Sequence, residues 1–213
     1  MSPRPIIDVT ELPHSAMDHR SAIWWGNAVL VLIETVMFVL LLAAYFYVRP
    51  NFTDWPPPKV YGPTAINDPV PALGWPLVNL ALILFSFLPV FWADRAALHR
   101  NEAAVKVALI IAILAGVGIA LLRFPEFEAL RFRWDDNAYG SIIWTLLGLH
   151  LFHVIIGTLE NVMMLAWILA RGMDDKHARD VRVAAVYWYW IIITWIVVFA
   201  VVFLEPRFGG ASP

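Results

Sequence analysis

The sequence of 213 residues contains no cysteine. Disulfide bonds, thiolate metal sites and cysteine nucleophiles are therefore excluded. Charged residues are also scarce, at 15% of the chain, where an ordinary soluble domain has about a quarter. The net charge of −2 argues against a nucleic-acid partner. The sequence shows no nucleophile with its base, no phosphate-binding loop and no paired-carboxylate catalytic site.

Apolar residues, in contrast, make up 61% of the chain. One compact domain of this size cannot hide so many apolar side chains, so lipid must cover the remainder. The segment 1–21 is polar and lacks the basic start and short apolar core of a signal peptide, and its acidic residues argue against an organellar transit peptide. We therefore predict one membrane domain, residues 1–213, with a polar N-terminal tail at 1–21.

Five segments are apolar over the length of about 20 residues that a membrane-spanning helix needs. The predicted fold is an all-α integral membrane bundle of five transmembrane helices, at about 22–48, 74–93, 104–122, 141–170 and 183–204. Pro89 is expected to kink the second helix. Arg123 is expected to end the third helix and to extend its long side chain to the membrane interface.

Loop charges predict the orientation, because cytoplasmic loops carry an excess of Lys and Arg. Nine of the 15 basic residues fall in the N-terminal tail and near the turns that follow the second and fourth helices. The other six lie on the opposite side. This distribution predicts a cytoplasmic N-terminus and an external C-terminus.

The third predicted helix carries a stripe of small residues. Ala108, Ala112, Gly116 and Ala120 recur at spacings of four, and small residues at that spacing let two helix backbones approach closely in lipid. We expect tight helix packing at Ala112, Gly116 and Ala120, either within the chain or against a partner.

Two of the predicted helices carry polar residues inside the membrane. Glu34 lies near the middle of the first helix, where a carboxylate costs at least about 2.5 kcal/mol. Asn27 lies seven residues earlier on the same face. In the fourth helix His150, His153 and Glu160 form one stripe. Because polar faces in lipid turn inward, we expect Glu34 to hydrogen-bond to His150 or His153, as a neutral acid or as an ion pair.

Three interpretations of these buried polar residues remain open. In the first they satisfy one another and fix the helix register. In the second they handle protons, since a buried carboxyl beside histidine can titrate near neutral pH. The third is a metal or haem site, which is disfavoured because a haem needs histidines on facing helices. His150 and His153 share one helix, and the remaining histidines are expected outside the membrane: His14, His19, His99 and His177.

Short motifs occur in four of the five predicted helices. Residues 148–158 of the fourth read Gly-x-His-x-x-His-Val-Ile-x-Gly-Thr. The first has a glycine, a glutamate eight residues later and a Met-Phe pair. The second has a proline–asparagine pair, and the fifth has a Tyr-Trp…Trp frame. These positions are Gly26, Glu34, Met37, Phe38, Pro76, Asn79, Tyr187, Trp188 and Trp195. In this combination the chain resembles subunit III of the haem–copper oxidases of the cytochrome c oxidase type.

The resemblance implies a non-catalytic subunit of an aerobic respiratory complex. Such subunits pack beside subunit I, bind phospholipid, and support proton uptake and turnover lifetime. The haem and copper are expected in partner subunits, and this chain is expected to bind no cofactor or metal. The implied partners are subunit I, subunit II and membrane lipids. The five-helix length resembles short bacterial members, which implies a prokaryotic plasma membrane.

Some positions depart from the family pattern. Tyr189 and Ile192 stand where the family usually has histidine and aspartate, and Glu160 is outside the pattern. These departures leave open a subunit III-like protein of a quinol oxidase or nitric oxide reductase. From other classes, a haem-carrying electron-transfer subunit and an independent proton-coupled transporter remain alternatives. A transporter of that kind often has paired repeats with broken helices, and no repeat stands out here.

Overall fold

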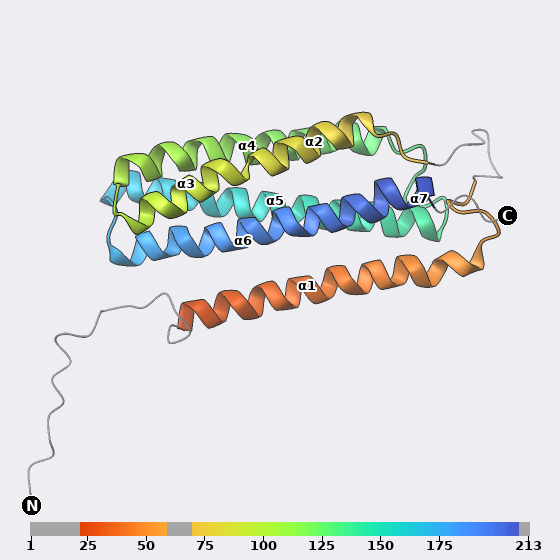
Figure 1. Ribbon diagram of the computed structural model, residues 1–213, viewed down its shortest axis with the longest axis horizontal. Coiled ribbons are helices and arrows are strands. Elements are labelled where there is room, and N and C mark those ends of the chain that lie inside the picture. Colours follow the sequence, from red (N-terminus) through yellow and green to blue (C-terminus); the bar gives the residue numbers. More distant parts are fainter. Residues whose placement is uncertain (1–21, 59–69, 209–213) are drawn as a thin grey trace, which may run out of the picture.

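The computed structural model describes residues 22–58 and 70–208, which form a bundle of long helices (Figure 1). Within these described residues, five helical spans are long and apolar enough to cross a membrane: Ala22–Asn51, Gly74–Leu98, Glu102–Glu128, Ala138–Arg171 and Asp175–Phe208. The prediction of an all-α bundle of five membrane-spanning helices is confirmed. The predicted N-terminal tail at 1–21 lies outside the described residues.

The first helix, α1 (Ala22–Val48), lies along one side of the bundle and continues into the short 3-10 helix η1 (Arg49–Asn51). It packs against α5 and α6 (Figure 1). Phe38 and Tyr45 are its buried residues, and most of its other side chains are exposed. Much of α1 therefore faces lipid or a partner rather than the rest of this chain.

The second span is interrupted at Ser86, between α2 (Gly74–Phe85) and α3 (Phe87–Leu98). The interruption lies three residues before Pro89, which has no N–H to donate to the carbonyl of Phe85. The hydroxyl of Ser86 donates to the carbonyl oxygen of Ile83 at 2.6 Å. The helix then continues to Leu98, beyond the predicted end at residue 93.

The end predicted for the third span at residue 122 is wrong. The helix α4 (Glu102–Glu128) continues past Arg123 and Pro125. Arg123 does not extend to the membrane interface, because its side chain is fully buried, with 0% exposed, next to buried polar partners. A carboxylate and an imidazole inside the bundle replace the water that this cation would otherwise need.

The fourth and fifth spans are joined by a short turn. Asn137 caps the start of α5 (Ala138–Arg171) by accepting a hydrogen bond from the Gly140 N–H at 2.8 Å. Asp174 caps α6 (Asp175–Phe199) in the same way. The prediction of a start at residue 183 is wrong, because the charged segment from Asp175 onward is already helical. A π-helical turn (Ala200–Leu204) and α7 (Glu205–Phe208) complete this span.

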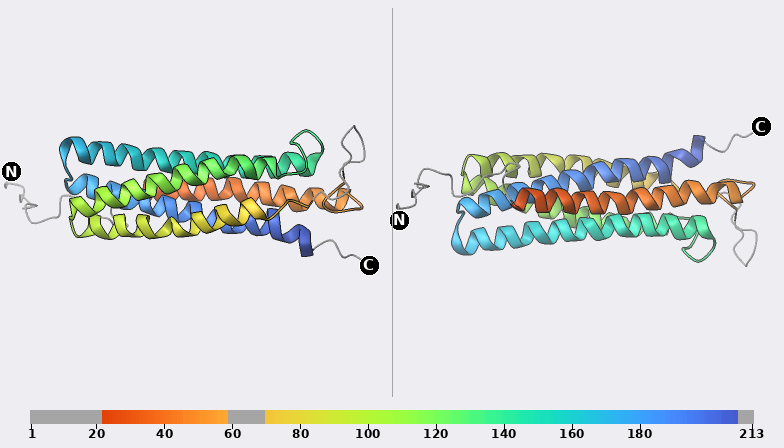
Figure 2. Two further views of the ribbon diagram at one scale, coloured as in Figure 1. Left: turned by 90° about the horizontal axis from the view of Figure 1, so that it is seen from above. Right: turned by 90° about the horizontal axis from the view of Figure 1, so that it is seen from below.

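α6 is the most buried of the five spans and packs against α1, α2, α3 and α5 (Figure 2). Trp188 and Trp195 are its largest fully buried side chains. The small-residue stripe of α4 faces the inside of the bundle, since a Cβ atom at Gly116 would lie 2.2 Å from Oγ1 of Thr158 on α5. The close approach at this glycine is therefore within the chain.

The start of α1, the α3–α4 turn and the α5–α6 turn lie at one end of the bundle (Figure 1). We call it the basic end, because most of the described Lys and Arg residues lie there: Arg95, Arg100, Lys106, Arg171, Lys176, Arg179 and Arg182. The predicted assignment of this end to the cytoplasm stays a prediction.

Candidate functional site

A polar contact joins α1 and α5 near the middle of both helices. Nε2 of His153 lies 2.9 Å from Oε2 of Glu34. The side chains are 3% and 19% exposed, respectively. The rings of Phe38 and Trp190 flank the imidazole, with centroids 5.4 and 5.2 Å away. Of the two histidines that the sequence offered as partners, the structure joins His153 to Glu34.

Hydrogen-bond geometry fixes the proton count of this pair. Nδ1 of His153 lies 2.6 Å from the carbonyl oxygen of Leu149, which only accepts, so Nδ1 carries a hydrogen. The bond from Nε2 to Glu34 then needs one further proton, on the carboxyl group or on the ring. Both forms, acid with neutral imidazole and carboxylate with imidazolium, have zero net charge. The pair therefore holds one shared proton without placing a net charge in the membrane.

His150 occupies a different environment from His153. Nη2 of Arg123 lies 3.0 Å from Nδ1 of His150. Arginine only donates, so Nδ1 accepts, and Nε2–H donates to the carbonyl oxygen of Ile191 at 3.1 Å. Both ring nitrogens are occupied and the ring is neutral. His150 thus links α4, α5 and α6 and does not pair with Glu34.

Arg123 and Glu126 form a buried ion pair one turn apart on α4. Nη1 of Arg123 lies 2.5 Å from Oε2 of Glu126, and both side chains are 0% exposed. The guanidinium also lies 3.8 Å above the ring of Trp195, in a cation–π contact. Sequence reasoning missed this pair. The available signal was the spacing of three between an arginine and a glutamate, which places both on one helix face.

The position of α1 beside α6 is set by a second hydrogen bond. Thr35 follows Glu34 immediately in the sequence, and its Oγ1 accepts a hydrogen bond from Nε1 of Trp190 at 2.8 Å. At the end opposite the basic end, Glu205 on α7 accepts from the Tyr45 hydroxyl at 2.6 Å and forms an ion pair with Arg49. These bonds hold α1 at its middle and at its far end.

Glu160 lies on the His153 side of α5, one heptad closer to the basic end. It is half-buried and makes no hydrogen bond within the described residues.

Of the four histidines expected outside the membrane, His99 lies in the α3–α4 turn and His177 in the first turn of α6. His14 and His19 lie outside the described residues.

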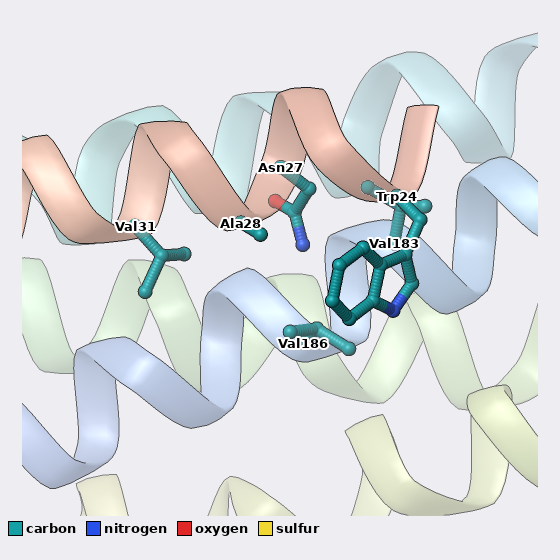
Figure 3. Close-up of a pocket in the computed structure, with 6 residues that line it drawn as sticks. All are labelled: Trp24, Asn27, Ala28, Val31, Val183 and Val186. Carbon is teal, nitrogen blue, oxygen red and sulfur yellow. The ribbon is translucent and has the colours of Figure 1, made fainter. Parts of the chain in front are cut away.

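Two clefts lie between α1 and α6. The larger, of about 230 Å³, runs beside Phe38, Leu42 and Trp190. The smaller, of about 140 Å³, lies near the start of α1, and there Asn27 points toward α6 (Figure 3). Within residues 22–58 and 70–208, no group of three His, Asp or Glu side chains is placed to hold a metal ion.

The fold and the site define a multi-pass helical membrane protein in which paired polar side chains join the helices inside the bundle. The family described as cytochrome c oxidase subunit III matches residues 7–205. The chain belongs to this family, and the resemblance identified from the sequence motifs is confirmed.

Individual relatives are similar over most of the chain. The cytochrome c oxidase subunit 3 of Pongo pygmaeus is 28% identical over 193 residues, which cover 89% of this chain and 72% of the relative. The protein of the same name from Petromyzon marinus is 28% identical over 190 residues, 88% of this chain and 71% of the relative. That from Drosophila melanogaster is 26% identical over 186 residues, 84% and 68% of the two chains.

Proposed function

We propose that this chain is the subunit III of a cytochrome c oxidase-type haem–copper terminal oxidase in aerobic respiration. It packs beside subunit I, in a complex that also contains subunit II, and has no active site of its own. The haem and copper are held by those partners, and phospholipid covers part of its apolar surface. Membership of the cytochrome c oxidase subunit III family supports the assignment to an oxidase complex. The exposed apolar side of α1 supports a partner or lipid along that helix.

Support of proton uptake is the second part of the proposal. The observation that carries it is the Glu34–His153 pair, which holds one proton in either of two forms with the same net charge. Transfer of this proton between the two groups leaves the net charge of the pair at zero, so it avoids the cost of a bare charge in lipid. Glu34 and His153 thus act as a local proton store for the oxidase, and Glu160 belongs to the same polar stripe.

The location proposed is a prokaryotic plasma membrane with the basic end in the cytoplasm. The excess of Lys and Arg at the basic end supports this orientation. An impermeant thiol reagent applied to intact cells tests it. Lys176 lies in the first turn of α6, at the basic end, and Arg133 lies just before the start of α5, at the opposite end. Because the chain has no cysteine, Lys176→Cys and Arg133→Cys each place one thiol in it. Labelling of Arg133→Cys alone is expected, and labelling of Lys176→Cys alone would reverse the orientation.

A pull-down of the tagged chain in mild detergent tests the subunit assignment. The optical spectrum and the masses of the co-purified proteins are measured together. Haem absorption with a large multi-helix haem–copper subunit is expected. The haem type and the partner then distinguish a cytochrome c oxidase from a quinol oxidase or nitric oxide reductase. A colourless chain that purifies alone would overturn the proposal and favour the proton-coupled transporter.

Turnover of the purified complex tests the proton-uptake role. Glu34→Gln removes the shared proton, so oxygen consumption should fall more steeply with rising pH than in the wild type. Glu128→Gln, which changes an exposed carboxyl at the end of α4, is the matched control. Identical pH profiles for the two variants would contradict the proton-uptake role and leave the subunit assignment untouched.

A further inference from the structure

Polar groups continue from the Glu34–His153 pair toward the basic end. α1 and α5 run antiparallel (Figure 1), and Glu34 on α1 meets His153 on α5. Asn27 lies one heptad from Glu34 along α1, and Glu160 lies one heptad from His153 along α5, both toward the basic end. Asn27 and Glu160 therefore lie at the same depth as each other and on the same helix faces as the pair. Seven residues of helix separate them from the pair by roughly 10 Å.

α6 contributes a hydroxyl between these two levels. The Tyr187 hydroxyl lies within electrostatic range of the carboxyl groups of Glu34 and Glu160. Its ring stacks on Trp190 with centroids 5.5 Å apart, and Trp190 in turn flanks His153. Asp180 lies about two turns of α6 closer to the basic end than Tyr187. It is within electrostatic range of Glu160. Titratable side chains on α5 and α6 thus lie at successive levels between the basic end and the pair.

The cleft beside Asn27 gives water a place near this line. Its volume of about 140 Å³ exceeds the roughly 10–15 Å³ that one water molecule needs. It lies between Trp24 near the start of α1 and Val183 and Val186 on α6 (Figure 3). The side chain of Asn27 offers a donor and an acceptor there, and apart from the indole N–H of Trp24 the other lining side chains are apolar.

Toward the opposite end, the route from the pair along α5 ends at a histidine whose ring is fully engaged. The larger cleft between α1 and α6 also lies on this side, and its lining is apolar apart from Thr35 and Thr194. His150 is the next titratable side chain in that direction along α5, and both its ring nitrogens are occupied, by Arg123 and by the Ile191 carbonyl. A proton added to His150 would sit beside the Arg123 guanidinium, and like charges at that distance repel strongly. The carboxyl group of Glu126 is already paired with Arg123. A fixed buried cation of this kind is a barrier to protons.

We propose that the Glu34–His153 pair exchanges its proton with one side of the membrane only, the side of the basic end, through Tyr187, Glu160 and water beside Asn27. Arg123 and His150 close the pair toward the other side. This inference rests on the proposed proton-handling role of the pair. It adds to that role the side from which the proton enters and the residues that block entry from the other side.

The test uses the whole oxidase complex in liposomes. Vesicle fractions enriched in either orientation are identified by impermeant labelling of the Lys176→Cys or Arg133→Cys thiol. Infrared difference spectroscopy follows the protonated carboxyl band of Glu34, which is assigned by its loss in Glu34→Gln. A pH step applied at the basic end should change this band at once. The same step at the opposite end should act only after the vesicle interior equilibrates.

Variants identify the path and the barrier. Tyr187→Phe combined with Glu160→Gln should slow the response from the basic end by at least about tenfold. Tyr189→Phe is the matched control, because Tyr189 points toward Phe87 on α3 rather than toward the pair. Arg123→Gln should open a response from the opposite end. If that variant does not assemble, the comparison of Tyr187 with Tyr189 decides the path.

The outcomes separate the two proposals. A band that responds from the opposite end as fast as from the basic end would overturn the one-sided access and leave the proton role standing. A response slowed equally by Tyr189→Phe and by the Tyr187 and Glu160 changes would overturn the path. A Glu34 band that responds to neither pH step would sink the proton-handling role itself, and the inference with it.

Discussion

Glu34 and His153 are 119 residues apart in the sequence and 2.9 Å apart between α1 and α5. The contact lies at the middle of a helix that buries little else, since Phe38 and Tyr45 are the buried residues of α1. The Thr35–Trp190 hydrogen bond lies next to it and ties α1 to α6. Polar contacts therefore decide where α1 sits, while its apolar surface stays available to lipid and partners.

Replacing Glu34 tests how far α1 depends on this contact. Glu34→Gln should leave assembly intact, because the amide NH₂ can donate to Nε2 of His153. Glu34→Ala leaves a buried imidazole without its partner and should lower the free energy of unfolding by about 1–3 kcal/mol. Thermal unfolding of the purified complex measures both. If both variants unfold and turn over like the wild type, the pair does not hold α1.

The choice between His150 and His153 shows where sequence reasoning stopped. Both histidines lie at the right depth on one stripe, so counting residues leaves either as the partner of Glu34. The rotation of α5 decides, and that rotation depends on Arg123, which binds His150. Arg123 was read as a membrane boundary because hydropathy treats a cation as a helix end. A buried partner on the same helix face reverses that interpretation.

Long apolar runs, in contrast, were sufficient to locate all five spans. The lipid requires each to be a helix whatever its partners are. The first helix ends at Val48, as predicted. The start of α6 was misplaced by eight residues, because the Asp174 cap and the charged surface turns after it are helical without being apolar.

Close packing at Gly116 leads to a second prediction. A Cβ atom there would lie 2.2 Å from Oγ1 of Thr158 and 3.0 Å from the Trp188 ring. Gly116→Leu should therefore force α4 away from α5 and α6, destabilising the chain by at least about 1–3 kcal/mol. Gly148→Ala is the control, since no atom lies within 4 Å of a Cβ there. The readouts are the unfolding temperature and co-purification with the complex in detergent. Co-purification of Gly116→Leu with the complex to the same extent as Gly148→Ala would contradict the close approach of the helices at Gly116.

The cap of α6 should give the α5–α6 turn an acid-dependent stability. The backbone N–H of His177 donates to the Asp174 carboxylate at 2.8 Å, and its ring Nδ1 lies 2.6 Å from the same oxygen. These bonds hold the pKa of Asp174 below its usual value. A carboxyl with a lowered pKa in the folded state stabilises that state above its unfolded pKa. This stabilisation is lost as the pH falls through the folded pKa.

Hydrogen exchange at the first turn of α6 measures this dependence. In the wild type, exchange should speed up as the pH falls through the acid range, after correction for the intrinsic rate. In Asp174→Ala it should be fast throughout and lose the dependence. Asp135→Ala, at the opposite end, is the control, and it should leave the α6 profile unchanged. An unchanged profile in Asp174→Ala would show that the cap does not hold this turn.

The buried Arg123–Glu126 pair should behave unlike the surface pairs of the same chain. Arg123→Met and Glu126→Leu each leave one buried charge without its partner, and each should destabilise the chain by about 3–5 kcal/mol. The double variant replaces both charges by apolar groups and should recover most of that loss. The exposed Arg133–Asp135 pair, broken by Arg133→Ala, should cost at most about 1 kcal/mol. Unfolding of the purified complexes that contain the wild type, each single variant and the double variant measures the coupling between Arg123 and Glu126. A double variant no more stable than the worse single variant would mean that His150 and Trp195, which also contact the guanidinium, need the cation itself.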